Sequence, residues 1–121
     1  MPVEKEFLTH VLELFSGLGP LRTARMFSGA AIYAEDDAMF AMISSSGTVY
    51  MKSDASTRAD FLASGAEPFW YMRGEKRMEI QSLLSLPESA LDAPEDAVFW
   101  AHKALPPARA AAKEKRRKKK S

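Results

Sequence analysis

The stretch of residues 22–40, RTARMFSGAAIYAEDDAMF, opens with the residues best suited to bind a ligand. Arg25 can hold an anion or a carboxylate by a two-pronged contact, and Gly29 follows it within the same segment. A phosphate-binding loop, however, uses several glycines before a helix, whereas Gly29 alone precedes a predicted strand. We therefore expect Met26 and Phe27 to fill the core while Gly29 lets the backbone turn into a sheet.

Two cations of the body, Arg25 and Lys52, are candidates for contact with an anion or a protein partner. Residue types that perform catalysis are sparse. The acids at residues 35–37 favour a solvated hairpin tip, because three adjacent acids at a strand turn do not point to one place. His10 and His102 fall on separate predicted helices, without a second ligand at metal spacing. Since cysteine and a Gly-x-Ser-x-Gly nucleophile elbow are both absent, we expect no catalytic residue, no metal site and no cofactor.

A run of bulky side chains at residues 68–73, PFWYMR, is suited to binding of another kind. Alternation along a strand separates Phe69 and Tyr71 from Trp70 and Met72. Exposed aromatic rings on a sheet stack nucleic-acid bases, but that use requires interleaved basic residues on the same face, and few are near. We therefore favour packing in the core or at a dimer interface.

The clearest surface feature is a basic tail at residues 113–120, KEKRRKKK. Its seven basic residues and one acid give it a net charge of +6, so the rest of the chain carries −5 within a total of +1. Such a run contacts phosphates rather than bases, which predicts non-specific nucleic-acid binding; a solubilising tail without a dedicated partner is the alternative. The candidate contacts are Lys113, Lys115, Arg116, Arg117, Lys118, Lys119 and Lys120.

The elements that must position these residues begin with one predicted helix and three predicted strands. Residues 2–19 carry apolar side chains at helical spacing, and glycines followed by Pro20 end the pattern. Residues 29–34, 38–43 and 48–52 are rich in strand formers and separated by EDD and SSSG, which predicts an antiparallel meander. Both faces of these strands are apolar, so we expect one face to pack on helices and the other on a second layer or subunit.

The second half of the chain completes an α+β pattern. A short helix precedes strands at 68–73 and 77–84. A longer helix opens near Pro94 and is expected to break at Pro106 and Pro107. The order of elements predicts an α+β fold with an N-terminal helix, a mostly antiparallel sheet of about five strands and C-terminal helices.

The length of 121 residues suffices for one domain, so we expect a folded domain at residues 1–105 and a basic tail, helical or disordered, at 106–121. The hydrophobic fraction of 46% is that of a packed body. The acidic N-terminus predicts no secretory signal, and no apolar run has the ~20 residues of a membrane helix. With the absence of cysteine, these features favour the cytoplasm. The residues expected in the core are Phe15, Phe27, Ile32, Phe40, Phe61, Phe69 and Trp100.

Four motifs follow one another in a specific order between about Phe7 and Leu105. They are Arg25-Met26-Phe27-Ser28-Gly29, the strand VYMK from Val49 to Lys52, the series Phe61, Gly65, Pro68, Phe69 and Tyr71, and Leu86-Pro87-Glu88 followed by Trp100. In order and spacing they resemble the N-terminal domain of the TfoX/Sxy family of bacterial competence regulators. The chain departs from the family pattern at Ser28, where the family has a glycine, and at Leu83 and Leu84, where it commonly has tyrosines.

The resemblance implies a non-enzymatic regulatory domain that acts by protein–protein contact, with a transcription regulator of the cyclic-AMP receptor type as its partner. Full-length regulators of the family carry a second, helical domain that this sequence does not include, so a single-domain form is expected. Two further hypotheses stay open. One is a small ligand-binding or enzymatic domain that uses the sheet face and Arg25, and the other is a homodimeric module whose second apolar sheet face is the interface.

Overall fold

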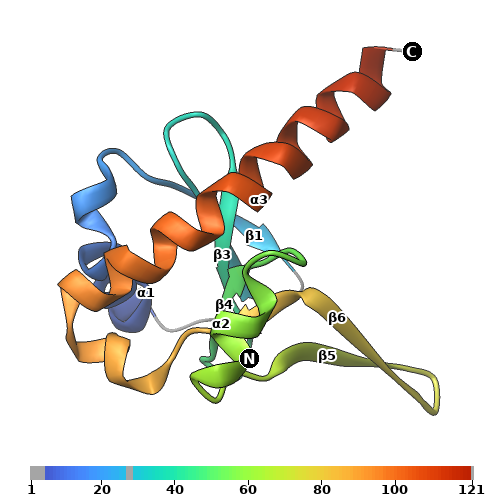
Figure 1. Ribbon diagram of the computed structural model, residues 1–121, viewed down its shortest axis with the longest axis horizontal. Coiled ribbons are helices and arrows are strands. Elements are labelled where there is room, and N and C mark those ends of the chain that lie inside the picture. Colours follow the sequence, from blue (N-terminus) through green and yellow to red (C-terminus); the bar gives the residue numbers. More distant parts are fainter. Residues whose placement is uncertain (1–4, 27–28, 121) are drawn as a thin grey trace.

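The computed structural model describes residues 5–26 and 29–120 as an α+β fold, which confirms the predicted fold class (Figure 1). Within these two ranges, no helix is both long enough and apolar enough to cross a membrane. The elements are α1 (Lys5–Leu14), the 3₁₀ helix η1 (Ser16–Leu18), β1 (Arg22–Met26), β2 (Gly29–Tyr33), β3 (Met39–Ile43), β4 (Val49–Lys52), α2 (Arg58–Ala63), β5 (Pro68–Arg73), β6 (Lys76–Ser85), the 3₁₀ helix η2 (Glu88–Asp92) and α3 (Pro94–Lys120).

One six-stranded sheet, in the order β1-β2-β3-β4-β6-β5, forms the centre of the described chain. All neighbouring strands run antiparallel. The order follows the chain except that β6 lies between β4 and β5. Residues 35–37 form the predicted tip of the β2–β3 hairpin, and Asp37 adopts the positive φ of 63° that such turns require.

The sixth strand, β1, is not among the strands that the sequence predicts, because residues 22–28 were interpreted only as the entry to the sheet. Arg25 pairs with Ala30 of β2, so the segment is an edge strand. Its sequence RTARM contains one β-branched residue, Thr23, and its strand propensity is therefore weak. Pairing with β2 decides its conformation instead. The predicted core positions of Met26 and Phe27 lie outside the described side chains.

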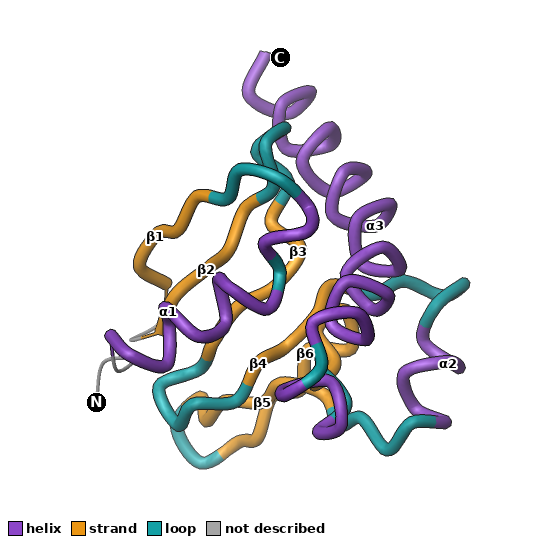
Figure 2. Tube along the Cα trace, turned by 90° about the vertical axis from the view of Figure 1, so that its left-hand side faces the viewer, coloured by secondary structure: helices purple, strands orange, loops and turns teal. Residues whose placement is uncertain are grey.

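Helices α1 and α3 pack against the same face of the sheet and enclose the main core (Figure 2). The ring of Phe15 meets Phe40 edge to face, with centroids 5.2 Å apart. Trp100 is only partly buried, against the prediction, because it lies where α3 meets α2 and covers Phe61, 4.7 Å away between ring centroids. The predicted burial is confirmed for Phe15, Ile32, Phe40, Phe61 and Phe69.

A second, smaller cluster lies on the opposite face of the sheet and consists of strand residues. Its buried members are Met42, Phe69 and Leu83. Met42 alternates with the main-core residue Ile43 along β3, which places the two side chains on opposite faces. Both faces are therefore apolar, as predicted, while the proposed second subunit on this face stays a prediction.

Helix α3 begins at Pro94, as predicted, but the predicted break at Pro106 and Pro107 is wrong because the helix continues to Lys120. Proline lacks an N–H donor and its ring clashes with the carbonyl four residues earlier, which disfavours a helix by about 3 kcal/mol per residue. Burial of one side of α3 against the sheet compensates for that cost. The buried residues around the prolines are Ala101, Ala104, Leu105, Pro107 and Ala108.

Replacement of the exposed Pro106 by alanine should stabilise the protein, because alanine restores the donor to the His102 carbonyl and removes the clash. We expect the free energy of unfolding to rise by about 1–2 kcal/mol in urea denaturation. Pro20→Ala is the matched control, since Pro20 is exposed and lies outside the helices. An equal effect of the two substitutions would contradict a continuous α3.

Gly29, the first residue of β2, is needed for a different reason from the one expected. Its φ lies outside the left-handed region, so the backbone conformation is open to other residues. The constraint is space, because a Cβ at this position would overlap the carbonyl oxygen of Ile43 on β3. Gly29 therefore permits close approach of two strands.

Gly29→Ala should lower the free energy of unfolding by about 3 kcal/mol, the upper end of overpacking effects, since a backbone atom must move. Gly17→Ala serves as the control. There the added methyl group meets the flexible Val98 side chain, whose Cγ2 lies at 3.2 Å, and a loss below about 1 kcal/mol is expected. Similar losses in denaturant titrations of the two variants would refute the close-approach explanation.

Candidate functional site

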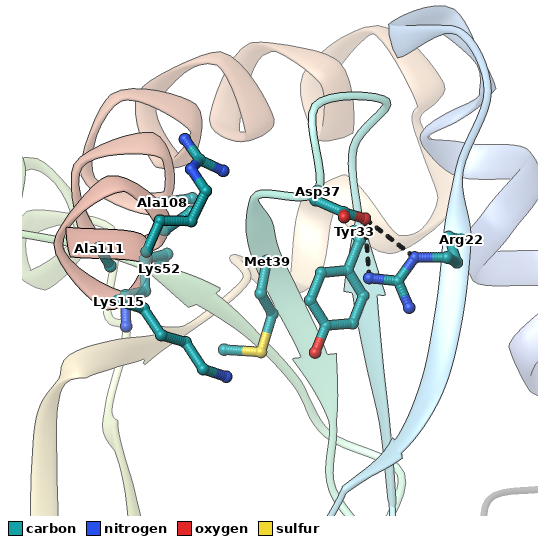
Figure 3. A pocket seen from close by; sticks show the side chains of 10 residues that line it. Arg22, Tyr33, Asp37, Met39, Lys52, Ala108, Ala111 and Lys115 are labelled. Atoms are coloured by element: carbon teal, nitrogen blue, oxygen red, sulfur yellow. Dashed lines mark hydrogen bonds and ion pairs between the residues drawn. The ribbon is translucent and has the colours of Figure 1, made fainter. Parts of the chain in front are cut away.

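A hollow of about 560 Å³ lies where the second half of α3 passes one end of the sheet (Figure 3). At this end β1 and β3 begin, while β2 and β4 finish. We call it the basic hollow, because its lining holds four basic side chains and one acid. The volume suits a small organic ligand. The lining residues are Arg22, Tyr33, Asp37, Met39, Lys52, Ala108, Ala111, Ala112, Lys115 and Arg116.

The sheet side of the basic hollow is a row of paired residues on three strands. Arg22 pairs with Tyr33, and Tyr33 pairs with Met39. Directly paired residues of antiparallel strands project from the same face, so the register brings the three side chains together. The Arg22 guanidinium lies over the Tyr33 ring, 4.0 Å from its centroid. It also donates from Nη2 and Nε to Oδ1 of Asp37, at 2.8 and 3.1 Å, so the only acid of the lining is already paired (Figure 3).

The helix side combines small residues with cations. Ala108, Ala111 and Ala112 face the hollow and, as alanines, leave its space open. Lys115 and Arg116 follow one turn after the last two alanines. Cations are favourable in the last turns of a helix because the helix dipole is negative there. The same turns that carry the predicted tail contacts therefore form one wall of the hollow.

Lys52, at the end of β4, supplies a half-buried cation to the hollow. Burial lowers the pKa of its ammonium group below the ordinary value of 10.5. In the described part of the chain, no carboxylate lies within ion-pair distance of Lys52, Lys115 or Arg116. The hollow thus holds three positive charges without a counter-charge, which is the arrangement that an anionic ligand would complete.

Two ion pairs hold α3 against the body. Arg109 Nε donates to Oδ2 of Asp36 at the β2–β3 tip, at 2.6 Å, and Lys103 Nζ donates to Oδ2 of Asp60 on α2, at 3.0 Å. The hydrogen bond from Arg109 lowers the pKa of the Asp36 carboxyl below its ordinary value of 3.8. Both pairs are exposed, so each contributes at most about 1 kcal/mol, but the first lies beside the hollow and fixes the distance of α3 from the hairpin tip.

The pairing of Asp36 predicts a small pH dependence of stability. A carboxyl whose pKa is lowered on folding stabilises the protein above its unfolded pKa, and that contribution is lost as the pH falls through the folded pKa. Arg109→Gln should therefore lower the free energy of unfolding by less than about 1 kcal/mol near neutral pH and have no effect once Asp36 is protonated. NMR titration should show the Asp36 pKa rising toward 3.8 in this variant. In Arg116→Gln it should stay low; an unchanged Asp36 pKa in Arg109→Gln would contradict the pairing.

The structure does not bring the two predicted body contacts together. Lys52 lines the hollow, whereas Arg25 is exposed on the edge strand β1. Arg22 and Arg25 are three positions apart on this strand, so their side chains lie on opposite faces. The candidate tail residues all lie on the last turns of α3, and Lys115 and Arg116 among them line the hollow. Side chains at 118–120 lie outside the described set.

The remaining candidates lie apart from the hollow or are already paired. His10 Nε2 is 2.8 Å from the backbone oxygen of Leu91. Among residues 5–26 and 29–120, no three histidine or acidic side chains gather closely enough to hold a metal ion.

The aromatic run of β5 is exposed for most of its length. Trp70 and Met72 are 44% and 53% exposed, and the Arg77 guanidinium lies 4.5 Å from the Trp70 ring centroid. The preference for core packing therefore holds for Phe69 alone. The reason is that the β5–β6 hairpin extends beyond the rest of the sheet (Figure 1).

Sequence reasoning missed Arg22, Tyr33 and Met39, the sheet side of the hollow. Each is ordinary in isolation, and they meet only through the register of β1, β2 and β3. Recognition of β1 as a strand would have placed Arg22 opposite Tyr33. The tail at 106–121 was expected to be helical or disordered, but the expected break at Pro106 and Pro107 gave no reason to place it along the line of α3 and over these residues.

Comparison with protein families gives a match to the model of the TfoX N-terminal domain over residues 13–108. The matched range includes the whole sheet and α3 as far as Ala108. No significant match was found among curated proteins.

Proposed function

The chain belongs to the TfoX N-terminal domain family, and on this basis we propose that it is a non-enzymatic, competence-related regulatory domain. It acts by binding other macromolecules, and two surfaces serve that purpose. One is the basic end of α3, and the other is the apolar sheet face that the strand cluster forms around Met42 and Phe69.

The basic end of α3 carries the nucleic-acid part of the proposal. Seven basic residues occupy the eight positions 113–120, within the last turns of a helix that projects beyond the sheet (Figure 1). Among the described side chains, Lys113, Lys115, Arg116 and Arg117 are exposed on this end of the helix. Phosphates are therefore contacted at the projecting end, without base recognition.

The protein partner is expected, from the family resemblance, to be a transcription regulator of the cyclic-AMP receptor type. Tyr71 of the projecting β5–β6 hairpin is exposed and lies on the same face as Phe69, with the two ring centroids 6.3 Å apart, so it extends this face with a large side chain of the kind that protein interfaces favour. In this proposal the domain joins a DNA-bound regulator by its sheet side while the basic helix end contacts nearby phosphates.

Removal of residues 113–121 should abolish most duplex-DNA binding. If all seven cations reach phosphates, the slope of log affinity against log salt is about −6 for the full chain and close to zero for the truncated one. Fluorescence anisotropy with labelled duplexes of two unrelated sequences measures both, and base sequence should matter little. The double variant Arg73→Gln, Lys76→Gln removes two exposed cations of the β5–β6 turn and should leave the slope unchanged.

Thermal stability is the accompanying control. The truncation removes none of the residues that the described chain buries, so the melting temperature should stay within a few degrees of that of the full chain. DNA binding by the truncated chain with the original salt slope would overturn the nucleic-acid part of the proposal. The tail would then be a solubilising end.

A further inference from the structure

We propose that the basic hollow binds a phosphate-bearing ligand of about nucleotide size, with the phosphate group among Lys52, Lys115 and Arg116. This inference goes beyond the regulatory role, since it depends only on the geometry between α3 and the sheet (Figure 3). It concerns an open hollow on the body, which shares Lys115 and Arg116 with the nucleic-acid proposal above and adds Lys52 of the sheet.

Charge is the first argument. Arg22 is satisfied by Asp37 at 2.8 Å, but the three other cations have no carboxylate partner among the described residues. Lys52 is half-buried, and a half-buried cation without a partner is unfavourable unless an anion joins it. A phosphate group carries up to two charges and several acceptor oxygens, enough for two ammonium groups and a guanidinium, whereas a single carboxylate would leave donors unused.

The shape of the hollow is the second argument. Three alanines of α3 keep open a space of about 560 Å³, far more than a phosphate group fills. Beside the cations, the hollow is lined by the Tyr33 ring and the thioether of Met39. The Arg22 guanidinium is stacked on the Tyr33 ring and holds it in place. An apolar, planar group attached to the phosphate fits such a floor, which indicates a nucleotide or a nucleotide unit of a strand.

Two substitutions test the site by separate means. Lys52→Met removes the charge and keeps an unbranched side chain that is one heavy atom shorter. Ala111→Leu removes no charge, suits a helix, and fills the hollow. Lys76→Met is the matched control, because it removes one exposed cation from the distant β5–β6 turn. The unliganded Lys52→Met protein should melt at or above the wild-type temperature, since the substitution removes an unpaired half-buried charge.

Isothermal titration calorimetry with adenosine 5′-monophosphate and with inorganic phosphate gives the first readout. We expect the monophosphate to bind more tightly than phosphate, and Lys52→Met and Ala111→Leu each to weaken it about tenfold or more. Lys76→Met should leave both affinities unchanged. Equal weakening by Lys52→Met and Lys76→Met would overturn the proposal, because it would indicate a general effect of surface charge.

A short single-stranded oligothymidylate is the second probe and identifies the source of the phosphate. If Lys52→Met and Ala111→Leu weaken its binding, the hollow takes a unit of a nucleic-acid strand; if they weaken only the monophosphate, the ligand is a free nucleotide. The proposed ligand site would be refuted if neither small probe bound and oligonucleotide binding depended on residues 113–121 but not on Lys52 or Ala111. That result would leave the regulatory proposal standing.

Discussion

The buried side of α3 is built mainly from alanines, and these let the helix backbone lie close to β3 and β4. Ala97, Ala101, Ala104 and Ala108 recur every three or four residues and form one continuous contact stripe. Leu105 is the single large residue among them and anchors the stripe in the core. This contact holds the helix in one line from the core to the end of the sheet. The alanine stripe also covers the main core on the side away from the sheet.

The position of α3 links the core to the surface. The helix that seals the core with its first half presents cations beside β1–β4 with its second half. Arg109, in the second half of α3, forms an ion pair with Asp36 at the β2–β3 tip. The next residue of the tip, Asp37, forms an ion pair with Arg22 of β1. Hairpin tip, edge strand and helix therefore act as one support for the hollow, although the residues come from distant parts of the sequence.

The sequence predicted those features that depend on local patterns. Hydrophobic alternation located β2, β3 and β4, and Pro94 with its acidic first turn located the start of α3. Features decided by tertiary packing were missed. The strand β1 has weak propensity and forms because β2 offers a partner, and α3 passes Pro106 because its neighbours are buried.

The candidate site shows the same division. Lys52, Lys115 and Arg116 were predicted as separate contacts from charge alone, and the structure brings them to one hollow. Their meeting could not be read from the sequence, because it requires a helix that was expected to break. Arg25 was chosen over Arg22 because it belongs to a recognisable motif, and strand alternation places Arg22 at the hollow instead.

The two prolines of α3 also divide the helix dynamically. Pro106 and Pro107 have no amide hydrogen, so the carbonyls of His102 and Lys103 lack their usual helical donors and the hydrogen-bonded ladder is interrupted between two segments. The first segment is locked by the core. The second is held by few buried contacts and one exposed ion pair, so its opening costs far less than global unfolding. Local opening is therefore expected to begin in the second segment, which forms the wall of the hollow, before it reaches the segment that seals the core.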